Sequence, residues 1–189
     1  MLARLAETGT YIDDPDDAAA LTEQAVAVAE ESDDPAALAA ALRARHLACS
    51  GPEGAGERDA LAGRLLGIGE RLAGPHTQLL ARSWRVDVGF ARGRLAAVAG
   101  ELENLRWCVQ QVGGPAGWHL LRYQAALAQA RGDFDIARQH ADAAFDTIAP
   151  LHHPAAFPIR MALLVSIDHH RGADPNAEHV QACRQTGRV

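Results

Sequence analysis

The residues best suited to chemistry lie near the C-terminal end, in the stretch SIDHHRGADPNAEHVQAC (166–183). His179 and Cys183 are four residues apart, a spacing at which two side chains of one helix can bind a metal ion. His169 and His170 are adjacent, so on a helix they point about 100° apart. A closed site would require the turn at 172–175 to fold back. We therefore expect neither a metal site nor a cofactor.

No side chain has the neighbours of a catalytic nucleophile. The sequence contains no G-x-S-x-G turn, and no serine has a base and an acid at the spacing of a recognisable triad. Cys108 lies in an apolar helical segment, where a buried thiol is unreactive. Together with Cys49 and Cys183 it forms no CxxC pair, so neither a disulfide framework nor a zinc knuckle is indicated. No catalytic residue is predicted, and we do not expect an enzyme.

The composition favours closely packed helices. Hydrophobic residues make up 48 % of the 189 residues and aromatic residues only 5 %, so the core must be built from Ala, Leu and Val. A sheet would favour β-branched and aromatic residues instead. The net charge of −6 and the pI near 5.8 argue against direct nucleic-acid binding, because phosphate contacts need a concentrated basic surface.

Membrane and secretion signals are missing from the sequence. No apolar run approaches the roughly 20 residues that span a bilayer. The first residues, MLARLAETGTYIDD, contain no continuous apolar segment and become acidic, unlike a secretory signal. We expect a cytoplasmic protein without membrane contact.

Proline and glycine divide the chain into helices. Asp-Pro and Gly-Pro pairs precede most of the alanine- and leucine-rich runs, as expected for an N-cap followed by the first helical residue. Gly93 and Gly132 end runs as left-handed residues do. No segment resembles a strand. The predicted helices cover residues 15–31, 35–49, 56–73, 75–92, 94–112, 116–131, 133–149, 154–171 and 175–186, after a short helical segment at about 2–8.

The stretch ALAQARGDFDIARQHADAAF (126–145) predicts a tight helical hairpin. Gly132 ends the first helix and Asp133 caps the second. Ala137, Ala141 and Ala144 then recur on one helical face, where the two helices would touch. Similar units recur with a period of about 38–42 residues, the mark of a helical solenoid. Their corresponding contact residues are Val98, Leu102 and Leu105 after Gly93; Ala60, Arg64 and Gly67; and Ala18, Thr22 and Ala25.

The motif RGDFDIARQHADAAFDTIAP (131–150) resembles the turn and second helix of a tetratricopeptide repeat. The stretches 35–61 and 78–102 are similar to the tetratricopeptide-like region of actinobacterial signal-transduction ATPases and maltose-regulator-like (LuxR-type) transcriptional activators. This resemblance implies a single all-α domain over 1–189, a right-handed α-α superhelix of about four hairpins. The chain contains no GxxxxGK[ST] loop and no basic recognition helix, so ATP hydrolysis and DNA binding are not carried over.

The resemblance also implies a concave groove lined by the first helix of each hairpin. Its arginines could hold an acidic peptide tail or a ligand carboxylate; alternatively, these are ordinary solvated helix positions. The candidate groove residues are Arg43, His46, Arg82, Asp87, Trp118, His119, Arg122, Gln129 and Arg160.

We therefore expect a protein- or peptide-binding module, the sensing or scaffolding arm of a bacterial regulator or a stand-alone relative. The alternative is a small-molecule sensor, or an unusual all-helical enzyme, with a pocket near Trp84 and Trp118. Packing between the alanine-rich helices is the preferred role of both side chains and of Trp107. A second copy could bind at the N-terminal end, because the segment at 2–8 is too short to be stable alone.

Overall fold

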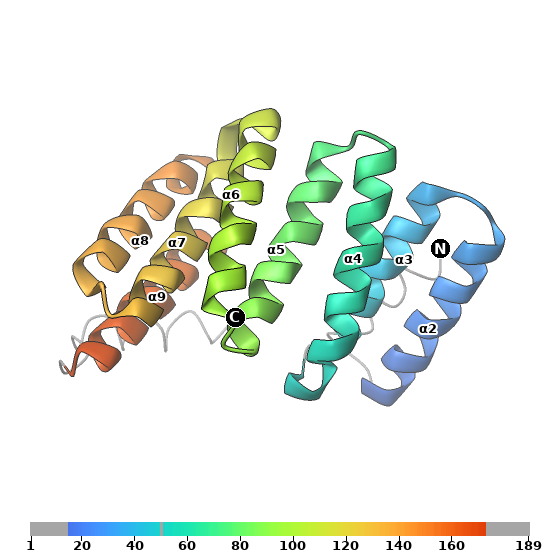
Figure 1. Ribbon diagram of the computed structural model, residues 1–189, viewed down its shortest axis with the longest axis horizontal. Helices are drawn as coiled ribbons and strands as arrows, with labels where there is room; N and C mark the ends of the chain where they lie inside the picture. The colour runs from blue at the N-terminus through green and yellow to red at the C-terminus, as the bar shows by residue number, and fades with distance from the viewer. Residues whose placement is uncertain (1–14, 50, 173–189) are drawn as a thin grey trace. The chain divides into compact units, whose positions relative to one another are not determined.

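The protein is helical throughout the part that the computed structural model describes, residues 15–49 and 51–172 (Figure 1). This part contains eight α-helices, three short 3-10 helices and no strand. The α-helices are α2 (Pro15–Glu31), α3 (Pro35–Ala48), α4 (Ala55–Arg71), α5 (Pro75–Ala91), α6 (Leu95–Val112), α7 (Gly117–Arg131), α8 (Phe134–Ile148) and α9 (Ala156–Arg171). The 3-10 helices are η1 (Pro52–Gly54), η2 (Gly114–Ala116) and η3 (Ala149–Leu151). The helices predicted at 2–8 and 175–186 lie outside the described residues.

Local signals set the helix ends. The Asp34 carboxylate accepts a 2.8 Å hydrogen bond from the Ala36 amide, and Pro35 is the first residue of α3. Gly132 ends α7 at φ +85°, and the Asp133 amide donates to the Ala128 carbonyl at 2.9 Å. The predicted side-chain cap at Asp133 is wrong, since that side chain makes no capping hydrogen bond. Its backbone (φ −84°, ψ 62°) lies outside the extended region that capping residues usually occupy.

The chain divides into two compact units, and the boundary in the sequence lies between Arg94 and Leu95. Unit 1 contains α2 to α5 and unit 2 contains α6 to α9, and in each unit sequence-adjacent helices pack together. The hairpin predicted around Gly93 spans the boundary, so neither unit contains it; Gly93 itself has the expected positive φ of 64°. The single domain over 1–189 stays a prediction. No described helix combines the length and the apolar character that crossing a bilayer requires.

The core of unit 1 confirms the predicted face of α2 and corrects that of α4. Ala18, Thr22 and Ala25 are buried as expected. On α4 the predicted contact residues Ala60, Arg64 and Gly67 are wrong: the first two are exposed and the third is half-buried. The buried residues are Leu61, Leu65 and Ile68, each one position later. The α3–α4 connection is longer than the α2–α3 and α4–α5 turns of the same unit, and one extra residue rotates the buried face by about 100°.

Two arginines tie the helices of unit 1 together. Arg45 on α3 donates to both carboxylate oxygens of Glu57 on α4, at 2.5 and 3.1 Å, and to the Ala19 carbonyl of α2 at 2.9 Å. Arg58 is 9 % exposed and donates to the carbonyls of Cys49 and Gly51, which closes the α3–α4 connection.

The α4–α5 hairpin has a different constraint, the close approach of two backbones. A Cβ atom on Gly69 would lie 3.0 Å from the backbone nitrogen of Gln78. The Gln78 side-chain amide donates to the Gly69 carbonyl at 3.1 Å. Any larger residue at this position would displace Gln78.

The core of unit 2 is centred on the α7–α8 hairpin and confirms its predicted alanine face. Ala137, Ala141 and Ala144 are all at most 2 % exposed, and Ala125 of α7 packs against Ala141. Helix α9 completes this core with Met161, Leu164 and Ile167. An ion pair between Arg138 on α8 and Asp168 on α9 fixes their contact.

The tryptophans divide into two kinds. Trp84 and Trp118 are each 7 % exposed and pack in the cores of unit 1 and unit 2. The expectation that Trp107 also fills the core is wrong, because its side chain is 50 % exposed on α6. The buried face of α6 is formed by Val98, Leu102, Leu105 and Cys108, and Trp107 lies about 100° away from Cys108 around the helix.

Candidate functional site

Three of the predicted groove residues form a cluster at the start of α7. The Arg122 guanidinium carbon lies 5.5 Å from the centre of the Trp118 ring and 4.1 Å from that of Tyr123, and it donates to the Tyr123 hydroxyl at 2.8 Å. The His119 ring is centred 5.1 Å from the Trp118 ring. His153, which precedes α9, adds a third ring at 5.3 Å from Trp118.

This cluster is electrostatically unusual. Burial, with help from Arg122 and His153, lowers the pKa of His119 to about 4, so the ring is neutral at pH 7. His119 Nδ1 and Arg122 Nε are buried and have no hydrogen-bond partner in the described part of the protein. Because these two atoms have no access to solvent, a ligand could reach only the outer edge of the guanidinium. The cluster is a packed stack rather than an open anion site.

The other two predicted groove residues of unit 2 hold α9 in place. Gln129 donates to the Ser166 hydroxyl at 2.6 Å, and its amide nitrogen lies 2.9 Å from His170 Nδ1. Arg160 forms a 2.7 Å ion pair with Asp142 of α8. Gln129 is eleven residues after Trp118, about 16 Å along α7. The structure therefore does not bring Gln129 to the Trp118 cluster.

Unit 1 contains the remaining predicted residues. His46 on α3 stacks on Trp84 of α5, and burial together with nearby Arg58 lowers the pKa of His46 to about 4. Arg82 lies 3.7 Å from a Glu70 oxygen, while Arg43 and Asp87 are exposed. A groove that includes all nine residues would need side chains from both units, and so would a pocket that includes both Trp84 and Trp118. Both stay predictions.

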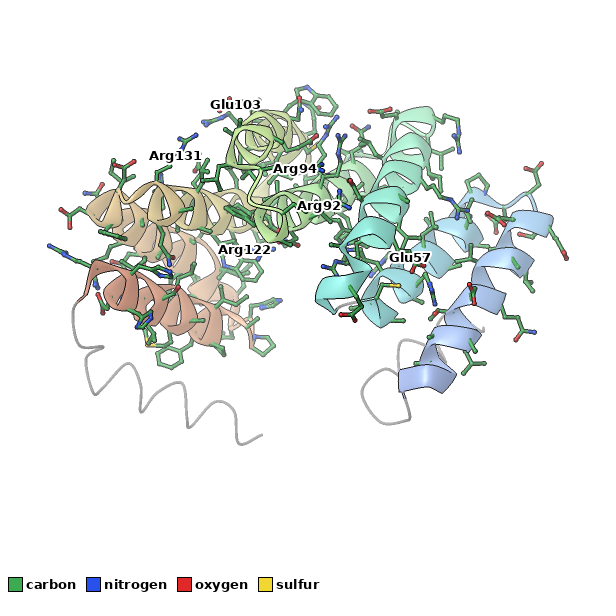
Figure 2. All side chains as sticks on the ribbon, turned by 60° about the horizontal axis from the view of Figure 1, so that its bottom comes forward. Glu57, Arg92, Arg94, Glu103, Arg122 and Arg131 are labelled. Atoms are coloured by element: carbon green, nitrogen blue, oxygen red, sulfur yellow. The ribbon has the colours of Figure 1, made fainter. Side chains whose placement is uncertain are left out.

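A cleft that the sequence analysis did not predict opens between α6, α7 and α8. Its volume is about 300 Å³. Buried Leu102, Leu127 and Ala128 form its apolar floor, and Ile136 at its mouth is 50 % exposed. Glu103 of α6 and Arg131 of α7 lie on the same side of the unit, as Figure 2 shows. The other lining residues are Ala99, Gln124, Asp133 and His140.

The cleft follows from the packing of α6 and α8 on a common neighbour. Both helices contact α7, which lies between them (Figure 1). Arg131 and Arg122 are nine residues apart on α7, so their side chains leave the helix about 180° apart. Figure 2 shows them on opposite sides of the helix. The cleft therefore opens on the side of α7 away from Arg122.

The charges at the cleft have both signs. Glu103 forms an ion pair with Arg106, one turn later on α6, at 3.4 Å. Arg131 and Asp133 form no ion pair with any residue that the structure describes. Arg131 ends α7 and Asp133 precedes α8, so each charge lies at the helix end whose dipole favours it. Both charges remain available to a bound molecule.

One signal in the sequence could have indicated this cleft. Ile136 stands one position before Ala137, outside the alanine face that packs on α7. A single exposed apolar residue is common on protein surfaces, so this signal does not locate a cleft by itself. The other lining residues give no comparable signal.

Within residues 15–49 and 51–172, no three His, Cys, Asp or Glu side chains come together as metal ligands. No family model matches the chain, and neither a curated protein nor a solved structure is significantly similar to it.

Proposed function

We propose that this chain is a protein-binding helical repeat module that holds a short segment of a partner in the cleft between α6, α7 and α8. The observation that carries the proposal is the cleft itself, with its apolar floor, its charges of both signs and the half-exposed Ile136. This combination suits an apolar side chain flanked by polar groups, the usual anchor of a bound peptide.

The packing of sequence-adjacent helices supports this proposal. A surface built from packed helices exists before binding, so little conformational entropy is lost when a partner arrives. In this proposal the helix pairs continue as a right-handed, tetratricopeptide-like superhelix, the sensing or scaffolding arm of a bacterial regulator. A compact 189-residue domain has a radius of gyration of about 16 Å. The superhelix predicts a clearly larger value in small-angle X-ray scattering.

Selection of peptides on the full chain tests the binding function. We would immobilise the protein, enrich binders from a display library of random linear peptides, and measure the affinity of the enriched peptides in solution. The variant Ile136→Glu places a charge at the mouth of the cleft, and we expect it to weaken binding at least tenfold. Enriched peptides should share one apolar residue with polar neighbours.

Leu151→Glu is the matched control, because Leu151 is 58 % exposed on η3 and does not line the cleft. It should leave peptide binding unchanged. Failure to enrich any peptide, or binding that Ile136→Glu does not weaken, would contradict the proposal. A thermal-shift screen with metabolites tests the small-molecule alternative. A large shift with one metabolite, without peptide binding, would favour a ligand sensor instead.

A further inference from the structure

Helix α2 leaves a second, uncharged stripe in contact with solvent. One face of the helix packs into unit 1 through Ala18, Thr22, Ala25, Val26 and Ala29. The opposite side exposes a stripe of five uncharged residues: Ala20, Leu21, Gln24, Ala27 and Val28. Leu21 is 39 % and Val28 48 % exposed, so two large aliphatic side chains of the stripe face solvent.

The spacing of the stripe is that of a helix–helix contact. Leu21, Gln24 and Val28 are at positions i, i+3 and i+7, so they lie in one row of about 10 Å along the helix. Ala20 and Ala27 flank this row and allow a second helix to approach closely. A partner helix of two to three turns would cover the row.

The charges that α2 itself contributes beside the stripe have one sign. The sequence of α2, PDDAAALTEQAVAVAEE, contains five acidic residues and neither lysine nor arginine. The exposed Glu23 and Glu31 lie beside the stripe and at its C-terminal end, whereas Glu30 forms an ion pair with Arg64 of α4. The carboxyl end of the helix dipole adds negative potential near Glu31.

We infer that the α2 stripe, Ala20, Leu21, Gln24, Ala27 and Val28, binds a basic amphipathic helix of another protein. Apolar residues of the partner cover Leu21 and Val28, and its flanking lysines or arginines face Glu23 and Glu31. A second copy that presented its own α2 is a poor occupant, since two acidic helices would then face each other. The surface belongs to unit 1 and is separate from the cleft of unit 2.

Three synthetic helical peptides test this inference on the full chain. The first carries leucines at i, i+3 and i+7 with lysines on both flanks. The second replaces the lysines with glutamates, and the third keeps the composition of the first but scatters its leucines around the helix. Fluorescence anisotropy should show binding of the first peptide alone, weakened at least tenfold by 0.5 M salt. Equal binding of the first and third peptides, or no binding of the first, would overturn the inference.

Protein variants locate the surface. Leu21→Gln combined with Val28→Gln should reduce affinity for the first peptide at least tenfold. Leu72→Gln, at another exposed leucine of unit 1 (58 %), should not change it. Circular dichroism confirms that each variant is folded. Unchanged binding to the double variant would contradict the inference.

Two other possible occupants of the α2 stripe, residues 1–14 and a second copy of the chain, can be distinguished by experiment. If residues 1–14 covered it through Leu2 and Leu5, Leu5→Gln would raise peptide affinity at least tenfold. If a second copy covered it, sedimentation velocity would show a dimer that Leu21→Gln dissociates. Either result would overturn the assignment to a basic helix of another protein.

Discussion

His46 lies flat against Trp84, with ring centres 3.8 Å apart and ring planes 11° from parallel. The two residues come from α3 and α5, so the stack joins two helices of unit 1 that are not adjacent in sequence. His46 Nε2 is buried and has no hydrogen-bond partner in the described structure. A protonated ring at this position would therefore place an uncompensated charge beside Arg58.

We predict that stability decreases as the pH falls from about 6.5 to about 4. The pKa values of His46 and His119 are both lowered to about 4 in the folded protein, chiefly by burial. Below the unfolded pKa of about 6.5, the unfolded chain takes up protons that the folded protein does not. The free energy of unfolding therefore decreases until the pH reaches the folded pKa. Urea unfolding at a series of pH values measures this loss.

Replacing both histidines should make the free energy of unfolding less dependent on pH between about 6.5 and 4. His46→Gln with His119→Gln removes the two groups, whereas His76→Gln changes an exposed ring and serves as the control. A profile that stays equally steep in the double variant would show that other groups cause the acid sensitivity.

Arg45→Met should destabilise the protein by about 1–3 kcal/mol, the usual cost of losing charge-assisted hydrogen bonds. The guanidinium connects α3 to Glu57 on α4 and to the Ala19 carbonyl on α2. Arg45→Lys should recover only part of this loss, because an ammonium cannot reproduce the two-point contact with Glu57. Arg43→Met, at an exposed position on the same helix, is the control. Equal urea midpoints for the Arg45 and Arg43 variants would contradict the prediction.

Two glycine substitutions should change stability in opposite directions. Gly132→Ala forces alanine into φ +85° and should cost about 1 kcal/mol, whereas Gly100→Ala, within α6, should stabilise by about 0.5–1 kcal/mol. A Cβ atom meets nothing within 4 Å at either position, so the backbone alone decides the sign. Thermal unfolding of both variants measures the difference. Destabilisation of equal size in both would show that another effect dominates.

The described thiols should react slowly with aromatic disulfide reagents. Cys108 is fully buried. Burial, followed by a hydrogen bond with Glu57, raises the pKa of Cys49 to about 11, so little thiolate exists at pH 8. The assay uses a Cys183→Ser variant, because Cys183 lies outside the described residues. Native protein should react at least tenfold more slowly than the same variant in urea, and similar rates would contradict this expectation.

The positions of the helices could be predicted from the sequence because local chemistry sets them. Pro35 and Pro75 begin helices where expected, and Gly93 and Gly132 take the expected positive φ. The rotation of α4 could not be predicted, since it depends on the path of the connection that Arg58 closes. Nothing local to Gly93 indicates that the chain divides into compact units just after it.

The candidate site was predictable only within one helix. Trp118, His119 and Arg122 share the first turns of α7, so their proximity follows from helical spacing. The stack of His46 on Trp84 joins residues 38 positions apart, and the cleft at Ile136 depends on how α6 and α8 both pack on α7. Contacts of this kind are set by tertiary packing, which periodicity does not encode.

The close approach at Gly69 also determines where unit 1 can bend. Since the Gly69 backbone abuts Gln78, α4 and α5 cannot slide past one another without collision and must move as one piece. Helices α3 and α4 are joined instead by side chains, through the ion pair of Arg45 with Glu57 and the hydrogen bonds from Arg58 to the Cys49 and Gly51 carbonyls, and such contacts can break and reform. A displacement of α2 and α3 against the α4–α5 pair would therefore break side-chain contacts, whereas a displacement of α4 against α5 would bring backbone atoms into collision.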